Sequence, residues 1–221
     1  GELHVVVLKM TATGTLVWQH TYSAGEVVDA RGGMTVAADG AVVVAGAIQA
    51  PKTGTVDIAA LLVKLGADGT LLFDKQIGGR GGEEGLGVAV GPDGAIHLSG
   101  TGNSSGAGFE DAFAVRVLGT GKKMTSAVSW GGPGFESNGG VAVAADGTVH
   151  LGATTNSGPP YFFLDAALKM SGARGTIGIP EGALADATGV AADPQGVIIV
   201  PAGSTTYAGN FEAGLIRFVQ P

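Results

Sequence analysis

The chain has 221 residues and a net charge of −7, and 41 of its residues are glycine while none is cysteine. The absence of cysteine excludes disulfides and thiolate metal sites, and the high glycine content disfavours long helices. The acidic charge makes nucleic acid an unexpected partner, and no apolar run reaches the roughly 18 residues of a transmembrane segment.

Short apolar runs bounded by glycine, proline and aspartate follow one another from residues 3–8 and 15–22 onward, which is the pattern of β-strands. The second unit shows the pattern most clearly, with runs at 61–65, 70–77, 87–90 and 95–100. Asp93-Gly94 between the last two runs predicts a hairpin, because such a turn needs positive φ. Four hairpin-linked strands are the content of one β-propeller blade.

Two markers repeat with a period of about 50 residues. A basic residue follows an apolar run at five places, 48 to 55 residues apart: Lys9, Lys64, Arg116, Lys169 and Arg217. An Asp-Gly turn recurs at Asp39, Asp93 and Asp146, with Gln195 in its place in the fourth copy. We therefore predict a single repeat domain over 1–221, with units at about 1–56, 57–109, 110–160 and 161–210 and a final strand at 211–221.

The small-residue run, such as 87–90, is predicted to be the innermost strand of each blade, and the run with the basic residue the third. The chain then begins with a third and a fourth strand and ends with a third strand at 211–219. A closed four-bladed ring has no place for this spare strand. We therefore predict an all-β, incomplete propeller or part of a larger ring, with a closed four-bladed propeller as the alternative. Open edges are possible self-association sites.

The residues 111–116, Trp130-Gly131-Gly132 and 140–147 are arranged like a bacterial β-propeller repeat, and Gly102-Asn103-Ser104 resembles its closing segment. The chain thus resembles the SBBP repeat family, named for seven-bladed β-propellers, in four degenerate copies. The fourth copy departs most, since it lacks the double glycine and the aromatic residue. The resemblance implies a scaffold in secreted or surface-attached bacterial proteins and brings no catalytic residues with it.

His97 and His150 occupy the same position in adjacent units, where Val43 and Ile199 stand in the others. Such a pair is a candidate metal or acid–base site, but the aliphatic replacements favour two histidines packed between blades. Acidic residues in the long loops would suit Ca²⁺, yet no Asp-x-Asp-x-Asp loop occurs. We expect no cofactor, with Ca²⁺ left open.

The candidate binding residues are charged and aromatic residues expected in loops on one face: Arg80, Glu83, Glu84, Phe135, Glu136, Tyr161 and Tyr207. Tyr22 and Phe109 are also expected near the blade junctions, as exposed rings that could stack on a glycan or a peptide. Trp18 and Phe73 share a position in the fourth strand and are expected in the core.

No catalytic constellation is recognised. The main hypothesis is therefore a non-catalytic interaction module of a secreted or cell-surface bacterial protein, which binds a protein or glycan partner through its loops or an open edge. A first alternative is a hydrolase or lyase at the mouth of the central channel, for which His20, Arg80, Glu83 or Glu136 would have to converge. A second alternative is a structural component of a larger assembly. The pattern leaves open whether the chain is an enzyme.

Overall fold

In the computed structural model of this chain, every regular element among the described residues is a β-strand. The structure describes residues 3–23, 27–29, 32–50, 57–78, 81–104, 109–131, 136–155, 161–164, 190–192, 197–207 and 210–219. These ranges contain seventeen strands, and no helix in them is long and apolar enough to cross a membrane.

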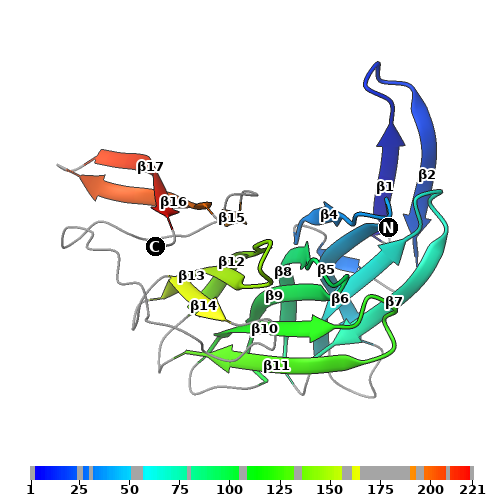
Figure 1. Cartoon of the computed structure of the whole chain (residues 1–221). Helices are drawn as coiled ribbons and strands as arrows, with labels where there is room; N and C mark the ends of the chain where they lie inside the picture. The colour runs from blue at the N-terminus through cyan, green and yellow to red at the C-terminus, as the bar shows by residue number, and fades with distance from the viewer. Residues whose placement is uncertain are drawn as a thin grey trace.

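The strands form five antiparallel sheets that follow one another in chain order (Figure 1). The first sheet is β1 (Val5–Met10) with β2 (Leu16–Tyr22). In the second sheet, β3 (Val27–Asp29) and β4 (Met34–Val36) both pair with β5 (Val42–Ala50), and β6 (Asp57–Leu65) and β7 (Leu71–Ile77) follow. The third sheet has the order β8 (Glu83–Val90), β9 (Ile96–Gly102), β10 (Asp111–Val117) and β11 (Met124–Trp130). The fourth contains β12 (Glu136–Val143), β13 (Val149–Thr155) and β14 (Tyr161–Leu164), and the fifth contains β15 (Ala191–Ala192), β16 (Val197–Tyr207) and β17 (Asn210–Val219).

This order confirms the predicted strand roles, with the basic residue on the third strand. Lys64 lies opposite Val43, and Arg116 lies opposite His97 in the same register. The fourth sheet departs from this pattern, because β13 pairs with Tyr161–Leu164 where the period predicts Lys169. Lys169 itself lies outside the described residues. Each predicted unit spans two sheets, since 57–109 holds β6 to β9, and the unit boundaries stay a prediction.

The predicted Asp-Gly hairpins are present in the second, third and fourth sheets. Gly40, Gly94 and Gly147 have φ values of 80°, 75° and 88°, which L side chains rarely adopt. In each turn the aspartate carboxylate accepts a hydrogen bond from the backbone N–H two residues later in the chain, as Asp93 does from Ala95 at 3.0 Å. The fourth predicted turn, at Gln195, lies outside the described residues.

The core is a series of apolar layers between adjacent sheets. Alternate residues of β6 serve two layers: Leu61 and Val63 pack with the first sheet, and Ala60 and Leu62 pack with the third. A further layer lies between the third and fourth sheets. The second sheet is therefore buried on both faces, as predicted for a blade between two neighbours.

Glycine lets the innermost strands of neighbouring sheets meet. A Cβ atom on Gly87 of β8 would lie 2.9 Å from the Cα of Gly140 in β12. No larger residue fits there without a backbone shift, which confirms the prediction of small residues where the blades converge.

The sheets do not close into a ring. Strand β1 pairs with β2 and β17 pairs with β16, in sheets at opposite ends of the series (Figure 1). The two strands that competed for one position in a closed ring therefore occupy separate sheets, and the incomplete propeller is the observed arrangement.

Candidate functional site

Two of the predicted binding residues, Glu83 and Glu84, begin strand β8. The prediction that they lie in a loop is wrong, because β9 extends to Gly102 and pairs with β8 at both of these positions. Side chains alternate along a strand, so the two carboxylates point to opposite faces of the third sheet. Glu83 is buried, with 6% of its surface exposed, and Glu84 is half-buried.

Glu83 and Asp111 flank one glycine. Both lie opposite Gly102 of β9, Glu83 from β8 and Asp111 from β10, so the three residues face the same side of the sheet. Two strand spacings, about 10 Å, separate the two acidic residues. A Cβ atom on Gly102 would lie 2.6 Å from Cγ of Glu83, which places the glutamate side chain over the glycine. Asp111 is also buried, at 2% exposure.

The closing segment of the repeat holds Glu83 in place. The N–H of Ser104 donates to Oε1 of Glu83 at 3.1 Å. Oδ1 of Asn103 accepts the N–H of Gly82 at 2.7 Å, and Oγ of Ser104 accepts the N–H of Gly81 at 2.8 Å. The Asn-Ser pair thus ties the start of β8 to the end of β9, and Ser104 has a structural role at the strand end.

Glu83 and Asp111 line a cleft of about 510 Å³ between β7 and the outer strands of the third sheet. The other walls are mainly apolar, and Lys75 adds one cation. A cleft of this composition can bind a small polar ligand, and a buried carboxyl there can exchange a proton with it. Among the described residues, no group of three or more histidines and acidic residues could hold a metal ion.

Asp111, Lys75 and Ser104 were not among the predicted site residues. Asp111 can be identified from the pairing register of β9 and β10, which places it opposite Gly102. Lys75 comes from a different sheet, and no local pattern links it to the two carboxylates.

A second cavity, of about 570 Å³, lies where the innermost strands end. Val36, Val90, Val143 and nearby alanines line it, together with Asp39 and Lys64. Nζ of Lys64 donates to the carbonyl of Gly119 at 3.0 Å. This mainly aliphatic lining does not match the catalytic site expected at a channel mouth.

The two histidines of the repeat are core residues, as the aliphatic replacements indicated. His97 and His150 are 2% and 0% exposed on β9 and β13. Burial lowers the pKa of each imidazole to about 4. Both are therefore neutral at pH 7.

Of the residues proposed for a hydrolase or lyase, His20 and Glu83 do not converge. His20 lies on β2 of the first sheet and Glu83 lies in the third, with the second sheet between them. Arg80 and Phe135 lie outside the described residues. Glu136, Tyr161 and Tyr207 are strand residues, at the first position of β12, the first of β14 and the last of β16. The binding role of these five residues and of Glu84 stays a prediction.

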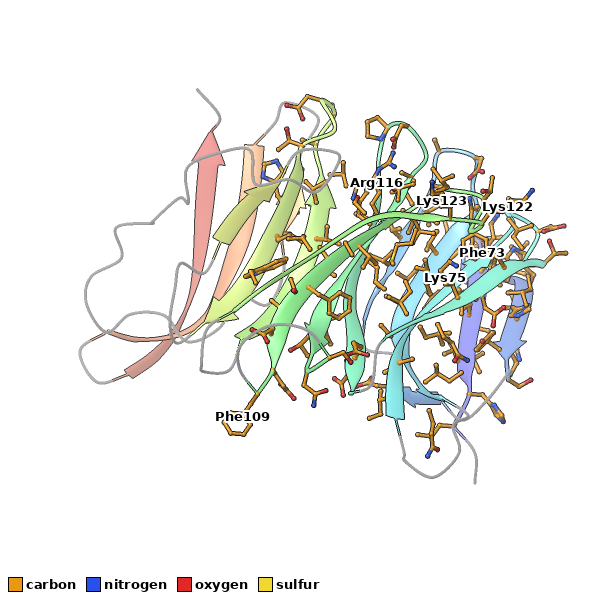
Figure 2. The ribbon with its side chains drawn as sticks, turned by 90° about the horizontal axis from the view of Figure 1, so that it is seen from below. Phe73, Lys75, Phe109, Arg116, Lys122 and Lys123 are labelled. Carbon is orange, nitrogen blue, oxygen red and sulfur yellow. The ribbon has the colours of Figure 1, made fainter. Side chains whose placement is uncertain are left out.

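Of the other aromatic residues, Tyr22 is not an exposed stacking group. It is 2% exposed, and its hydroxyl donates to Oδ2 of Asp74 in the second sheet at 2.7 Å. Burial and the neighbouring carboxylate raise the pKa of Tyr22. Phe109 is 73% exposed and projects from the end of the third sheet away from Arg116 (Figure 2).

A repeated contact, which we call the clasp, joins each of the first two sheets to the next. Nζ of Lys9 and Nε1 of Trp18 both donate to the carbonyl of Ala67, at 3.1 and 2.9 Å. The ring of Trp18 covers Gly69 of the same turn, because a Cβ there would lie 2.8 Å from Cδ2. The predicted core position of Trp18 is thus a contact between sheets.

The second sheet repeats the clasp on the β10–β11 turn of the third. Lys64 binds Gly119, which corresponds to Ala67, and a Cβ on Gly121 would lie 2.5 Å from Cγ of Phe73. Figure 2 shows Phe73 beside this turn, which also carries Lys122 and Lys123. The basic third-strand residue and the aromatic residue opposite it therefore act together.

The first sheet also has a turn of the kind that receives the basic and aromatic residues of the clasp, and none of the described residues contacts it in this way. Its turn has the same backbone bonding, since the N–H of Gly14 donates to Thr11 as that of Gly69 does to Gly66. Gly14 has a φ of 83°, and no atom lies within 4 Å of a Cβ built on it.

The apolar surface beside this turn is also uncovered. Val6, Leu8 and Met10 of β1 are 51%, 50% and 54% exposed, and we call them the open face. The corresponding residues of β6, Leu61, Val63 and Leu65, are at most 1% exposed, because a preceding sheet covers them.

No family model matches the chain, and no curated protein matches it. Similar solved structures include a luciferin-regenerating enzyme, with 12% sequence identity over 91% of this chain and 64% of that chain and a TM-score of 0.52. Regucalcin from Agrobacterium tumefaciens strain C58, a calcium-binding protein, has 14% identity over 90% of this chain and 62% of that chain, with a TM-score of 0.41. The chain thus spans less than two thirds of either neighbour. Both are β-propellers, so the likeness to the first shows the fold, and the chain is an open β-propeller.

Proposed function

We propose that this chain is a non-catalytic interaction module of a secreted or cell-surface protein, which binds a protein partner through the open end of its propeller. The observation that carries the proposal is the open face of Val6, Leu8 and Met10, about half exposed, beside an uncovered receiving turn. Contiguous apolar surface of this kind marks protein interaction sites.

The chemistry of the open face favours a protein over a glycan. Its three side chains are aliphatic or thioether groups, whereas sugar rings are recognised by aromatic stacking and dense hydrogen bonding. The free edge of β1 adds unpaired backbone groups that can pair with another strand. A partner with an apolar sheet surface would satisfy both features.

Photo-crosslinking from a single introduced cysteine tests the proposal, because the natural chain has none. Leu8→Cys carries the photoprobe on the open face, and Leu72→Cys on β7 is the matched control, at 54% exposure against 50% for Leu8. We expect the Leu8 probe to capture a protein that the Leu72 probe does not. Identical products from both positions would refute a specific open end.

The cleft between the second and third sheets favours a second candidate, a hydrolase or lyase. The observation that supports this candidate is the pair of buried carboxylates, Glu83 and Asp111, in a cleft that Lys75 also lines. One structural neighbour is also named as an enzyme. Assays of ester and glycoside cleavage with the natural chain and Glu83→Gln test it. Turnover that Glu83→Gln removes would support the cleft, and turnover unchanged by that substitution would exclude it.

A further inference from the structure

We propose that the open end of the first sheet binds the fifth sheet of a second copy of this chain, so that copies associate head to tail. This inference rests on the proposed function and names its partner. It follows from the series of sheets, in which the described residues show one end without a preceding sheet and the other without a following sheet.

The fifth sheet has the register that the donor half of the clasp needs. Arg217 of β17 lies opposite Ile199 of β16, just as Lys64 of β6 lies opposite Val43 of β5. Arg217 therefore occupies the third-strand position from which Lys9 and Lys64 bind the turn of the following sheet. Among the described sheets, a basic residue at this position binds the turn of the following sheet in the first two, whereas Arg116 of the third sheet binds Asp93 and Thr125 of its own sheet.

The first sheet has the matching acceptor. Ala12 precedes Gly14 by two residues, as Ala67 precedes Gly69 and Gly119 precedes Gly121, and it is exposed. Its carbonyl therefore corresponds to the two carbonyls that accept a lysine in the described sheets. A guanidinium can donate to such a carbonyl as an ammonium does.

The apolar content of this end argues for a sheet as its occupant. Stacked repeats stay soluble when their terminal units have a polar outer face. Here the outer face of β1 presents Val6, Leu8 and Met10, whose equivalents in β6 are covered by a sheet. A two-stranded sheet is also marginal alone, and a second packing partner would stabilise it.

The proposed contact joins two different surfaces, so it is heterologous. Each copy keeps one free end after binding, and further copies add until the rotation closes a ring or a filament grows. The mass in solution should therefore rise with concentration beyond that of a dimer, unless a small ring closes.

Light scattering after size exclusion tests the association with the natural chain, Leu8→Lys and the matched control Leu72→Lys. A lysine on the open face would be desolvated at the interface, so we expect Leu8→Lys to weaken association tenfold or more and Leu72→Lys to leave it unchanged. Both positions are half exposed, and circular dichroism should show the same fold for all three proteins.

Crosslinking identifies which surfaces meet. Ala12→Cys and Val219→Cys, two residues beyond Arg217 on the same strand, are made as separate proteins and treated with a short bis-maleimide, alone and mixed. We expect a crosslink between positions 12 and 219 in the mixture and little product from Ala12→Cys alone. A product from Ala12→Cys alone that matches the mixture would mean two first sheets meet, and it would overturn the head-to-tail arrangement.

A chain that stays monomeric at its highest soluble concentration overturns the inference. If the Leu8 photoprobe then captures a different protein and the Leu72 probe does not, the interaction module stands and only the identity of its partner is wrong. If the Leu8 and Leu72 probes give the same products, the proposed function fails as well.

Discussion

His97 should make the fold sensitive to mild acid, and replacing it with valine should remove that sensitivity. The imidazole is 2% exposed between the third and fourth sheets. Burial and, to a smaller extent, the Arg116 guanidinium lower its pKa from 6.5 to about 4, with the Asp93 carboxylate opposing the shift. Valine is the natural choice, because Val43 occupies the same position in the second sheet at 0% exposure.

The sign of the effect follows from the direction of the shift. Below pH 6.5 the unfolded chain binds a proton on this histidine, while the folded chain stays neutral until about pH 4. Stability due to this group is therefore complete above pH 6.5 and is lost as the pH falls toward 4. Each pH unit in this window costs about 1.4 kcal/mol, and the whole window costs about 3 kcal/mol.

Urea unfolding followed by tryptophan fluorescence at several pH values between 7 and 4.5 measures this slope. The exposed turn carboxylates do not interfere, because the pKa values of Asp68, Asp93 and Asp146 are lowered below 3.8. As the pH falls, the free energy of unfolding of the natural chain should drop by about 1.4 kcal/mol per pH unit more than that of His97→Val. At pH 7 its stability should change by only about 1 kcal/mol, since Nδ1 of His97 has no hydrogen-bond partner to lose.

Two further variants complete the test. His150→Ile introduces the residue that stands at this position in the fifth sheet, and it should reduce the slope as His97→Val does, because burial also lowers the pKa of His150 to about 4. His20→Val, at a partly exposed position of β2, is the control. If His97→Val keeps the full slope of the natural chain, the imidazole is not held neutral by the fold, and the argument from burial is refuted.

Three other experiments test individual contacts. Gly69→Ala should destabilise the fold by about 3 kcal/mol, and Gly14→Ala by only about 1 kcal/mol, because both need positive φ but only Gly69 lies under a tryptophan ring; thermal unfolding compares them. Tyr22→Phe should cost about 1 kcal/mol at pH 7 and flatten the loss of stability above pH 10, since the raised pKa of this hydroxyl favours folding only below that pH. Gly102→Ala should cost about 2 kcal/mol, and at least half of that should disappear when Glu83→Ala is also present, which a double-mutant cycle measures.

The repeat, the strand order and the hairpins could be predicted because each is encoded locally. An aspartate followed by a glycine at positive φ specifies its own turn, as at Asp93-Gly94, and a period of about 50 residues repeats it. The open arrangement also followed from counting strands. The SBBP family itself stays a prediction, since only the propeller fold is shown.

The functional geometry could not be predicted in the same way, because it depends on contacts between units. Glu83 and Asp111 face the same side of the third sheet only through their common register with Gly102, and a shift of one residue in either pairing would place them on opposite faces. The period located Lys9 and Trp18, but their partner is a backbone carbonyl at Ala67, which has no side-chain signature. Residue type therefore identified the donor half of the clasp and not its acceptor.

The proposed association would use the same kind of contact, the clasp, that joins sheets within the fold. The clasp is directional, since the basic and aromatic residues of the first and second sheets contact the turn of the next sheet, so each of these contacts has a donor side and an acceptor side. Inside the series the two sides stabilise the fold, as Lys64 does on Gly119. At the first sheet, the turn at Gly14 has the same backbone bonding, and no described residue lies within 4 Å of a Cβ atom built there. The proposed association would therefore need no separate binding motif, because it would use the same kind of interface that joins the sheets of the propeller.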